Sequence, residues 1–382
     1  MPRQEGDVYC LHPEAMIPGH RVDLLVDGAA AYPAMLEAIA AATREIHLET
    51  YIWEGDKTGE RFADALAERA RAGVVVRAIV DAVGGFGLSE TLRRRMRDAG
   101  VQLVDFHPVA PWRRRWNWSV RDHRKVLVVD GRTAFAGGLN LGDEYAPREW
   151  GGGAWHDVHV RVIGPGVREI QKEFAATFRY AADADAEPLV IRRDTPAVAG
   201  HARMCVLASR NRRGRKTIRR THYHAMKRAR ERIWIAQAYF VPDRALRRIL
   251  RNAVKRGIDV RVMLPQKSDV RAVYWASRAI YARLLRWGVK IFEWTPTILH
   301  AKTVCVDGIW SSVGSYNLDW RSFLYNWELS LALVDPPTAK ALEKRFEADL
   351  PSCVPVDPAT WTKRPAWHRL LEAFFYVFRR WL

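Results

Sequence analysis

A pattern of histidine, lysine and aspartate with fixed gaps, His-x-Lys-x-x-x-x-Asp, occurs twice in this chain. The two copies comprise His123, Lys125 and Asp130, and His300, Lys302 and Asp307. A chain with an internal repeat folds as similar units that pack together, so this repeat constrains the architecture more than any other feature. Two copies of one site also indicate a single active centre built from two halves.

The match continues beyond each motif. Asn140 follows the first copy and Asn317 follows the second at the same distance, and Gly138 and Ser315 occupy equivalent positions just before them. A single His-x-Lys pair is common by chance, whereas a doubled pattern with matching downstream residues is not.

Each motif contains an apolar run closed by Asp-Gly, which is typical of a strand that enters a tight turn. Residues two apart on a strand share a face, so each motif histidine lies beside its lysine. Asp130 and Asp307 have the opposite parity and fall at the turns. We therefore expect these two carboxylates to accept backbone hydrogen bonds there.

The segments before the motifs are also repeated. A strand-like run, a helical pattern ending in glycine and a second strand-like run occupy residues 46–80 and again 233–264, and a further helix and strand follow in each half. Gly73 and Gly257 fit helix C-caps. This alternation predicts an α/β fold, namely two α/β/α sandwich halves with mixed, largely parallel sheets, related by a pseudo-two-fold axis.

A change of composition marks the join between the halves. Acidic Ala-Asp repeats give way to arginine-rich sequence, and we interpret residues 188–210 as a linker. We expect a first half over residues 1–190, a second half over 191–350 and a C-terminal segment over 351–382.

The composition limits the partners. The 382 residues carry a net charge of +18, which predicts a polyanionic partner, either nucleic acid or a membrane surface rich in acidic lipid. The four cysteines lie far apart without a C-x-x-C pair, so we expect no disulfide framework, no metal and no cofactor. The chain shows neither a secretion signal nor a run of about 20 apolar residues, so we expect it neither to be secreted nor to span a bilayer.

If the motif strands meet across the axis, two imidazoles and two ammonium groups converge with the carboxamides of Asn140 and Asn317. Such a cluster stabilises a phosphate with cations and hydrogen-bond donors in place of a metal. One histidine can attack phosphorus while the other protonates the leaving alcohol, after which a second alcohol attacks. A nucleophilic imidazole also needs a carboxylate on its other nitrogen, and the motif aspartates point away.

The doubled HxKxxxxD pattern with its Gly-Ser-x-Asn continuation resembles the phospholipase D superfamily. The resemblance implies metal-independent phosphodiester transfer in two steps and favours His123 as the attacking histidine, although spacing alone leaves the order open. It implies that Asp157 and Glu328, which open the strands after the motifs, orient the histidines. It counts both motif triplets as catalytic and gives supporting roles to Asn140, Asn317, Ser315, Asp157 and Glu328. Gly138 departs from the usual serine, which predicts an asymmetric site.

Several strings are similar to bacterial cardiolipin synthases, in the short form without N-terminal membrane helices: residues 46–52, 122–131, 299–303 and 314–323. The resemblance implies transfer of a phosphatidyl group to the hydroxyl of phosphatidylglycerol. Phosphatidylglycerol and phosphatidylethanolamine are the expected substrates, at the cytoplasmic face of the bacterial membrane, and the sequence leaves the identity of the donor lipid open. A phospholipase D that hydrolyses lipids, a DNA nuclease of the superfamily and a membrane scaffold are the alternatives. The intact double motif and aromatic tail count against the last two.

Two aromatic segments predict contact with anionic lipid. The run 112–118 interleaves tryptophan with arginine, as in an interfacial loop or a nucleic-acid strip, and a solvated basic loop is the alternative. Near the C-terminus, apolar residues recur on one face of a helix: Trp367, Leu370, Leu371, Phe374, Phe378 and Trp381. We expect this helix to lie in a membrane interface, the alternative being that it docks on the protein's own core.

Overall fold

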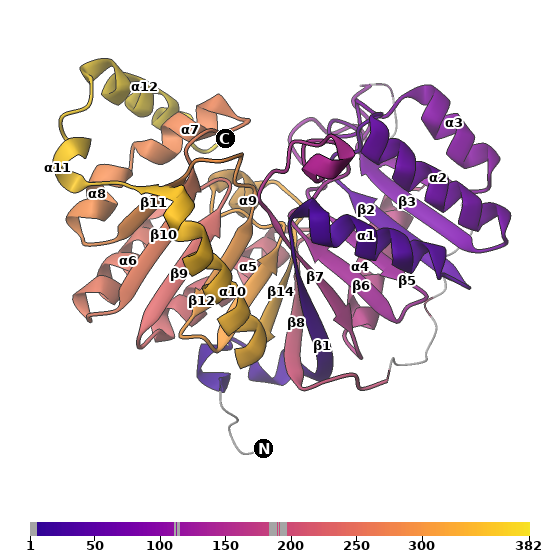
Figure 1. Cartoon of the computed structure of the whole chain (residues 1–382), viewed down its shortest axis with the longest axis horizontal. Coiled ribbons are helices and arrows are strands. Elements are labelled where there is room, and N and C mark those ends of the chain that lie inside the picture. The colour runs from indigo at the N-terminus through magenta and orange to yellow at the C-terminus, as the bar shows by residue number, and fades with distance from the viewer. Residues whose placement is uncertain (1–5, 111, 113–114, 183–188, 190, 192–196) are drawn as a thin grey trace.

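The computed structural model describes residues 6–110, 112, 115–182, 189, 191 and 197–382 (Figure 1). After two short 3-10 turns, η1 (Asp7–Tyr9) and η2 (Pro13–Ala15), the first half contains β1 (Ile17–Val26), α1 (Asp27–Ala40), β2 (Glu45–Thr50), α2 (Lys57–Arg71), β3 (Val75–Asp81), α3 (Glu90–Asp98), β4 (Gln102–Phe106), β5 (Val126–Val129), β6 (Thr133–Gly137), β7 (Val158–Ile163) and α4 (Val167–Ala181).

The second half repeats this order with one helix divided and a short helix added before its last strand. It contains β8 (Ala202–Ala208), α5 (Arg212–Arg228), β9 (Arg232–Gln237), α6 (Arg244–Lys255), β10 (Asp259–Pro265), α7 (Arg271–Arg278), α8 (Tyr281–Arg286), β11 (Lys290–Trp294), β12 (Lys302–Val306), β13 (Trp310–Gly314), α9 (Trp320–Leu324), β14 (Leu329–Val334) and α10 (Pro336–Asp349). The C-terminal segment adds β15 (Cys353–Pro355), α11 (Pro358–Trp361) and α12 (Ala366–Val377).

All strands of the described residues belong to one mixed sheet. The order in the first half is β4-β3-β2-β5-β6-β7-β1, and the second half has the matching order β11-β10-β9-β12-β13-β14-β8. The halves join where β1 and β8 pair antiparallel, with Ile17 opposite Met204. The predicted repeat and the α/β class with a mixed sheet are confirmed, but the halves share a sheet across the pseudo-two-fold axis.

The expectation of largely parallel sheets is wrong. In the part of the chain that the structure describes, only β2–β3, β3–β4, β9–β10 and β10–β11 pair in parallel. The motif strands instead return by hairpins, because the turn residues Asp130 and Gly131 have φ of 54° and 64°, and Asp307 and Gly308 have the same values. Two successive positive φ angles give a tight turn that reverses the strand, so β5–β6 and β12–β13 are antiparallel.

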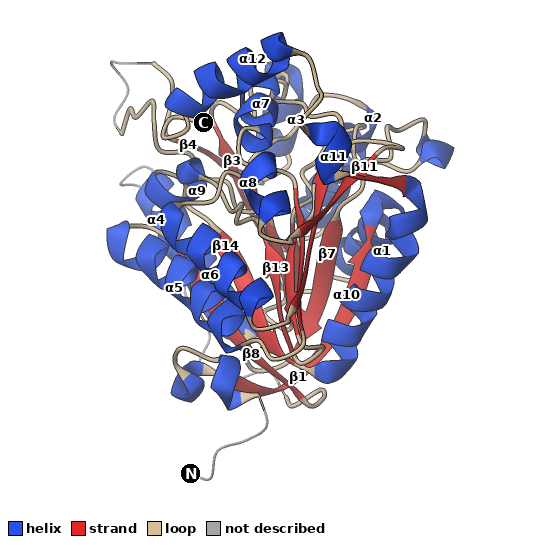
Figure 2. Cartoon of the chain, turned by 90° about the vertical axis from the view of Figure 1, so that its left-hand side faces the viewer, coloured by secondary structure: helices blue, strands red, loops and turns tan. Residues whose placement is uncertain are grey.

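Helices cover both faces of the sheet, with α1 and α10 on one side and α4, α5 and α6 on the other (Figure 2). Their ends are fixed by sequence. Asp56 accepts a hydrogen bond from Gly59 N at the start of α2, and Asp243 accepts one from Leu246 N at the start of α6. Gly73 follows α2 with φ of 88°, as predicted for a C-cap, and Gly257 does the same after α6.

The predicted domain boundaries are only partly testable. Several residues of the proposed linker lie outside the described residues, so the division at 190 stays a prediction. The segment after residue 350 is not purely an interfacial tail, because β15 pairs antiparallel with β11 and extends the sheet. None of the helices among the described residues is both long and apolar enough to cross a membrane.

The C-terminal helix α12 docks on the protein with one face and leaves another face apolar and exposed, so each interpretation of its sequence holds for one face. It packs against α7, and Phe375 and Tyr376 reach the buried side chains of Val273 and Ala276. Its outer face stays apolar and exposed, with Trp367, Leu370, Phe374, Val377, Phe378 and Trp381 all more than two-fifths accessible. The helix ends at Val377, earlier than the predicted stripe, and Leu371 is half-buried.

Candidate active site

The two motif histidines lie at the centre of the molecule, each held by the backbone of the other half. His123, just before β5, donates its N–H to Trp327 O at 2.9 Å. His300, just before β12, donates its N–H to His156 O at 2.7 Å. Both contacts join the start of a motif strand to the segment that opens a strand of the opposite half, so the repeat itself brings the histidines together.

The two predicted carboxylates contact the histidines in a crossed arrangement. Glu328 Oε2, in the second half, lies 3.1 Å from His123 Nδ1, in the first half. Asp157 Oδ2, in the first half, lies 2.7 Å from His300 Nδ1, in the second. A carboxylate on Nδ1 fixes the tautomer and leaves Nε2 as the free nitrogen of each ring.

Both motif lysines are buried beside their histidines. Lys125 Nζ donates to His123 O at 2.6 Å, and Lys302 Nζ lies 2.8 Å from His300 Nδ1. Burial, helped by the charge of Lys302, lowers the pKa of Lys125 to about 7, and burial lowers the pKa of Lys302 to about 8. The buried lysines therefore form a cationic site that an anionic ligand would stabilise.

The histidines respond to the same surroundings. Burial and the charge of Lys125 lower the pKa of His123, and burial and the charge of Lys302 lower the pKa of His300 further. The four groups act on one another across the axis, since the charge of Lys302 also lowers the pKa of His123. One electrostatic cluster thus contains both motifs, and it disfavours a positive charge on either imidazole.

The two carboxylates differ in their surroundings. Burial raises the pKa of Glu328, but the charge and hydrogen bond of His123 and the Ser315 hydroxyl outweigh it and bring that pKa below its usual value. Ser315 Oγ donates to Glu328, and Ser322 Oγ donates to its other oxygen at 2.8 Å. Burial raises the pKa of Asp157, and the charge of Lys302 offsets this only in part. The site is asymmetric, as the Gly138 position predicted.

The reason for glycine at position 138 is steric. A Cβ at Gly138 would lie 2.2 Å from Asp157 Oδ1, so any side chain there displaces this carboxylate. The second half has Ser315 at the equivalent position, where its hydroxyl supports the longer Glu328 instead. The pairing of glycine with aspartate and of serine with glutamate thus follows from the space beside each histidine.

The predicted carboxamides occupy different environments. Asn140 accepts a hydrogen bond from Ile52 N at 3.1 Å and donates one to Tyr145 Oη at 2.6 Å. The ring of Tyr145 lies 5.2 Å from that of His300, so Asn140 positions a neighbour of the histidine. Asn317 is buried, and its Oδ1 has no partner among the residues that the structure describes.

The motif aspartates lie at the far end of their strands. Asp130 accepts backbone N–H groups from Thr43, Arg44 and Glu45 at 2.8–3.0 Å. Asp307 accepts the corresponding groups from residues 230–232 at 2.7–2.9 Å. Their expected role at the turns is confirmed. Each lies five positions along the chain from its lysine, about 16 Å when the strand is extended. This placement argues against a catalytic role, which stays a prediction.

Sequence reasoning missed an arginine inside the first motif. Arg124, between His123 and Lys125, is fully buried and donates to Thr177 Oγ1 at 2.8 Å and to Ser209 O at 3.1 Å. The carboxylates of Glu49 and Glu173 lie within 3.6 Å of it. The second motif has Ala301 at this position, and this difference was the available signal.

A second missed group is His156, next to Asp157. Its Nδ1 lies 2.7 Å from Asp27 and its Nε2 lies 2.9 Å from Asp349, which belongs to the other half. Burial lowers its pKa, but the two carboxylates outweigh this and raise it to about 9. A charged imidazole thus joins the halves beside the site. Sequence reasoning singled out only the neighbouring Asp157.

Two tyrosines line the histidines at equivalent places. The ring of Tyr51, after β2, lies 5.1 Å from that of His123, and the ring of Tyr239, after β9, lies 6.4 Å from that of His300. Within the described ranges, no group of three or more His, Cys, Asp or Glu side chains is arranged to hold a metal ion.

The tryptophan-rich run of the first half is described in part. Arg113 and Arg114 lie outside the described residues. Trp112, Trp116 and Trp118 are 86%, 47% and 70% exposed.

Comparison with known proteins identifies the family. The family model of the cardiolipin synthase, PLD-like domain matches residues 35–181 and 223–350. A cardiolipin synthase of Geobacillus sp. (strain WCH70) is 35% identical over 92% of this chain and 70% of its own length. Cardiolipin synthase A of Pseudomonas aeruginosa (strain LESB58) is 38% identical over 90% and 69%.

Solved structures share the fold. Phosphatidylserine synthase from Haemophilus influenzae Rd KW20 aligns over 99% of both chains with a TM-score of 0.73 and 14% identity. Polyphosphate kinase from Porphyromonas gingivalis covers 94% of this chain and 53% of its own, with a TM-score of 0.57 and 14% identity. Since the family model matches both halves and close relatives cover nine-tenths of the sequence, the chain belongs to the cardiolipin synthase family with phospholipase D-like domains.

Proposed function

We propose that this protein is a cardiolipin synthase, which transfers a phosphatidyl group through a phosphohistidine to the hydroxyl of phosphatidylglycerol. The observation that carries the proposal is the crossed pairing of His123 with Glu328 and of His300 with Asp157. Two oriented imidazoles inside one cluster of buried lysines supply a nucleophile, an acid and charge for a phosphate. The names of the relatives support the same activity.

In the first step Nε2 of His123 attacks the phosphorus of the donor lipid, and the bond from phosphorus to the leaving alcohol breaks. His300, protonated when the anionic substrate is bound, gives its proton to the leaving oxygen. Lys125 and Lys302 hold the non-bridging oxygens, where negative charge is concentrated. The products are a phosphatidyl-histidine and the free alcohol.

In the second step the hydroxyl of phosphatidylglycerol loses its proton to neutral His300 and attacks phosphorus. The bond between phosphorus and His123 breaks, which restores the imidazole and leaves His300 protonated for the next cycle. A phosphatidyl group has then moved from one alcohol to another with no net change of proton count.

The unequal acids support His123 as the nucleophile. A phosphohistidine is positively charged on its ring, and an ionised carboxylate stabilises it. Glu328 has a lowered pKa, whereas Asp157 has a raised one. His300, with the weaker carboxylate, releases its proton more readily, which suits the general acid.

The substrates belong to a membrane, and we propose that the protein binds anionic phospholipid at the cytoplasmic face of the bacterial membrane as a peripheral protein. The exposed apolar face of α12 and Trp112 and Trp118 fit an interface. Arg321 connects these two segments. Its guanidinium donates to Ser119 O, next to Trp118, at 3.4 Å and to Trp381 O, after α12, at 3.5 Å. The net charge of +18 adds attraction of about 1 kcal/mol for each basic residue near the surface.

Mass spectrometry of lipids made by the purified protein tests the activity. Vesicles of phosphatidylglycerol, with and without phosphatidylethanolamine, are expected to yield cardiolipin and the matching free alcohol. Phosphatidic acid without any cardiolipin would instead identify a hydrolase and refute the synthase proposal.

A second experiment tests the order of the histidines. With a donor whose leaving group needs no protonation, His300→Ala is expected to accumulate a lipid adduct on a peptide containing His123, because attack by the acceptor loses its base. His123→Ala is expected to form none. An adduct on His300, or near-normal turnover of either variant, contradicts the mechanism.

A further inference from the structure

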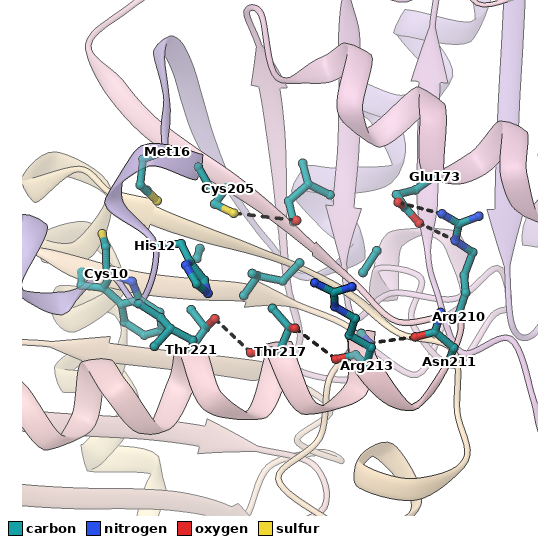
Figure 3. A pocket seen from close by; sticks show the side chains of 18 residues that line it. Cys10, His12, Met16, Glu173, Cys205, Arg210, Asn211, Arg213, Thr217 and Thr221 are labelled. Carbon is teal, nitrogen blue, oxygen red and sulfur yellow. Dashed lines mark hydrogen bonds and ion pairs between the residues drawn. The ribbon is translucent and has the colours of Figure 1, made fainter.

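A cavity of about 340 Å³ lies outside the active site, between the N-terminal 3-10 turns, β8 and α5. Figure 3 shows Cys10 and Met16 at one end of it and Arg210 at the other, with Thr217 on α5 between them. Pockets for small molecules occupy roughly 300–1,000 Å³, so the volume admits one slender ligand.

One part of the cavity wall is apolar. Met16, Leu207 and Ala332 contribute aliphatic groups, and the half-buried thiol of Cys205 lies in the same wall. Trp310 is fully buried and also contributes to the lining.

The other end of the cavity is positive. Arg210 and Arg213 are exposed there, at the start of α5, whose first turn contains no acidic residue. The N-terminus of a helix attracts anions through its unpaired N–H groups and its dipole. Glu173 is the acidic residue in the lining, and its Oε2 is neutralised by Arg210 Nε at 3.2 Å and by Arg124 at 3.5 Å.

We propose that this cavity binds an amphiphile with one anionic head, a phosphate or a carboxylate, and a single apolar chain. The head lies at Arg210 and Arg213, and the chain extends along Leu207 and Cys205 toward Met16. This combination matches the charged end and the apolar walls, which neither a free anion nor a neutral chain does. The site is separate from the histidine cluster, so the proposal stands independently of the proposed function.

Cys205 provides a direct reporter, because its thiol lies in the cavity wall. Cys353, on β15 and outside the cavity, is also half-buried, so it serves as the internal reference. The full-length protein is treated with a small thiol reagent at pH 8.5, with and without dodecyl phosphate below its micelle concentration. Peptide mass spectrometry then gives the modification rate of each cysteine.

Dodecyl phosphate is expected to slow the modification of Cys205 and to leave Cys353 unchanged. Arg213→Ala, which removes an exposed guanidinium, should weaken this protection about tenfold. Arg220→Ala, on the same helix but outside the lining, should keep it. Equal protection in both variants overturns the role of the charged end.

Two other probes separate the parts of the proposed ligand. Inorganic phosphate supplies the head alone, and dodecyl maltoside supplies the chain without charge, so both are expected to protect Cys205 much less. Equal protection by phosphate overturns the apolar chain, and equal protection by the maltoside overturns the anionic head. If dodecyl phosphate leaves the rate at Cys205 unchanged, the whole proposal is wrong.

Discussion

At the scale of single residues, the site is governed by burial. Lys125 and Lys302 are almost inaccessible, and their pKa values fall to about 7 and about 8 because water no longer stabilises the charge. The arrangement is stable without a substrate because the lysines can release their protons. A phosphate supplies the missing anion and recharges them.

Ligand binding should therefore take up protons. An anionic phosphodiester raises both lysine pKa values, so at pH 7.5–8 binding of dibutyl phosphate, whose own charge is constant, is expected to consume protons. The contribution of the lysines to this uptake should vanish near pH 6, where both are already charged, which leaves the contribution of His300. Affinity should fall by up to about tenfold per pH unit for each lysine above pH 8. Calorimetry in buffers of different ionisation enthalpy measures this.

Lys125→Arg, which cannot lose its charge, should reduce the proton uptake. Unchanged uptake in that variant contradicts the assignment of the uptake to Lys125.

Gly138 should not tolerate even a methyl group. Gly138→Ala places a Cβ against the Asp157 carboxylate, which must leave His300, so turnover is expected to fall at least about a hundredfold. Asp157→Asn should be similarly impaired, and the double variant should be no worse than either, because both changes remove the same contact. Steady-state turnover measures this, with circular dichroism as a check of folding. If the loss in the double variant equals the sum of the two single losses, Gly138→Ala causes a defect separate from the Asp157 contact.

At the scale of helices and strands, local rules predicted much of the structure. The period of a strand placed His123 beside Lys125 and Asp130 at the turn, and Gly73 marked a helix end, since each depends on near neighbours in sequence. Whether neighbouring strands pair in parallel or antiparallel was not predictable from near neighbours in sequence. Hairpins return the motif strands, and the pairing of Ile17 with Met204 joins segments remote in sequence. The crossing of Glu328 to His123 likewise depends on how the halves pack.

The exposed face of α12 should control binding to lipid. Leu370→Glu combined with Phe374→Glu replaces two exposed apolar side chains of α12 by charges. Binding to phosphatidylglycerol vesicles is expected to weaken at least about tenfold, with turnover of a soluble short-chain substrate retained. Vesicle sedimentation measures this. Val198→Glu, at an equally exposed valine near the start of β8, is the matched control, and equal loss there would indicate a general charge effect.

At the scale of the whole molecule, the two halves are joined both by the sheet and by charge. The β1–β8 pairing makes the sheet continuous, and the His156 bridge to Asp27 and Asp349 fastens the halves beside the site. The sheet contact persists at any pH, whereas the bridge depends on a proton. The stability of the joined molecule should therefore vary with pH at this point.

The His156 bridge should stabilise the protein only while the imidazole is charged. Its folded pKa is about 9 against 6.5 unfolded, so the contribution is complete below pH 6.5 and is lost as the pH rises through 9. The shift corresponds to about 3 kcal/mol. Urea unfolding of the wild type and of His156→Gln at pH 6 and pH 9.5 measures it, and the gap between them should close at the higher pH. A gap that is constant with pH contradicts the bridge.

The crossed histidine–carboxylate pairs also determine which halves can be exchanged between related proteins. Each repeat carries the carboxylate that contacts the histidine of the other repeat. A chimera that combines one half of this protein with the opposite half of a relative keeps every histidine and lysine. In both histidine–carboxylate pairs, however, the two partners then come from different proteins. Such hybrids should work only where each carboxylate still reaches Nδ1 of the histidine on the other side of the new junction. A change in the carboxylate of one repeat therefore acts on the histidine of the other.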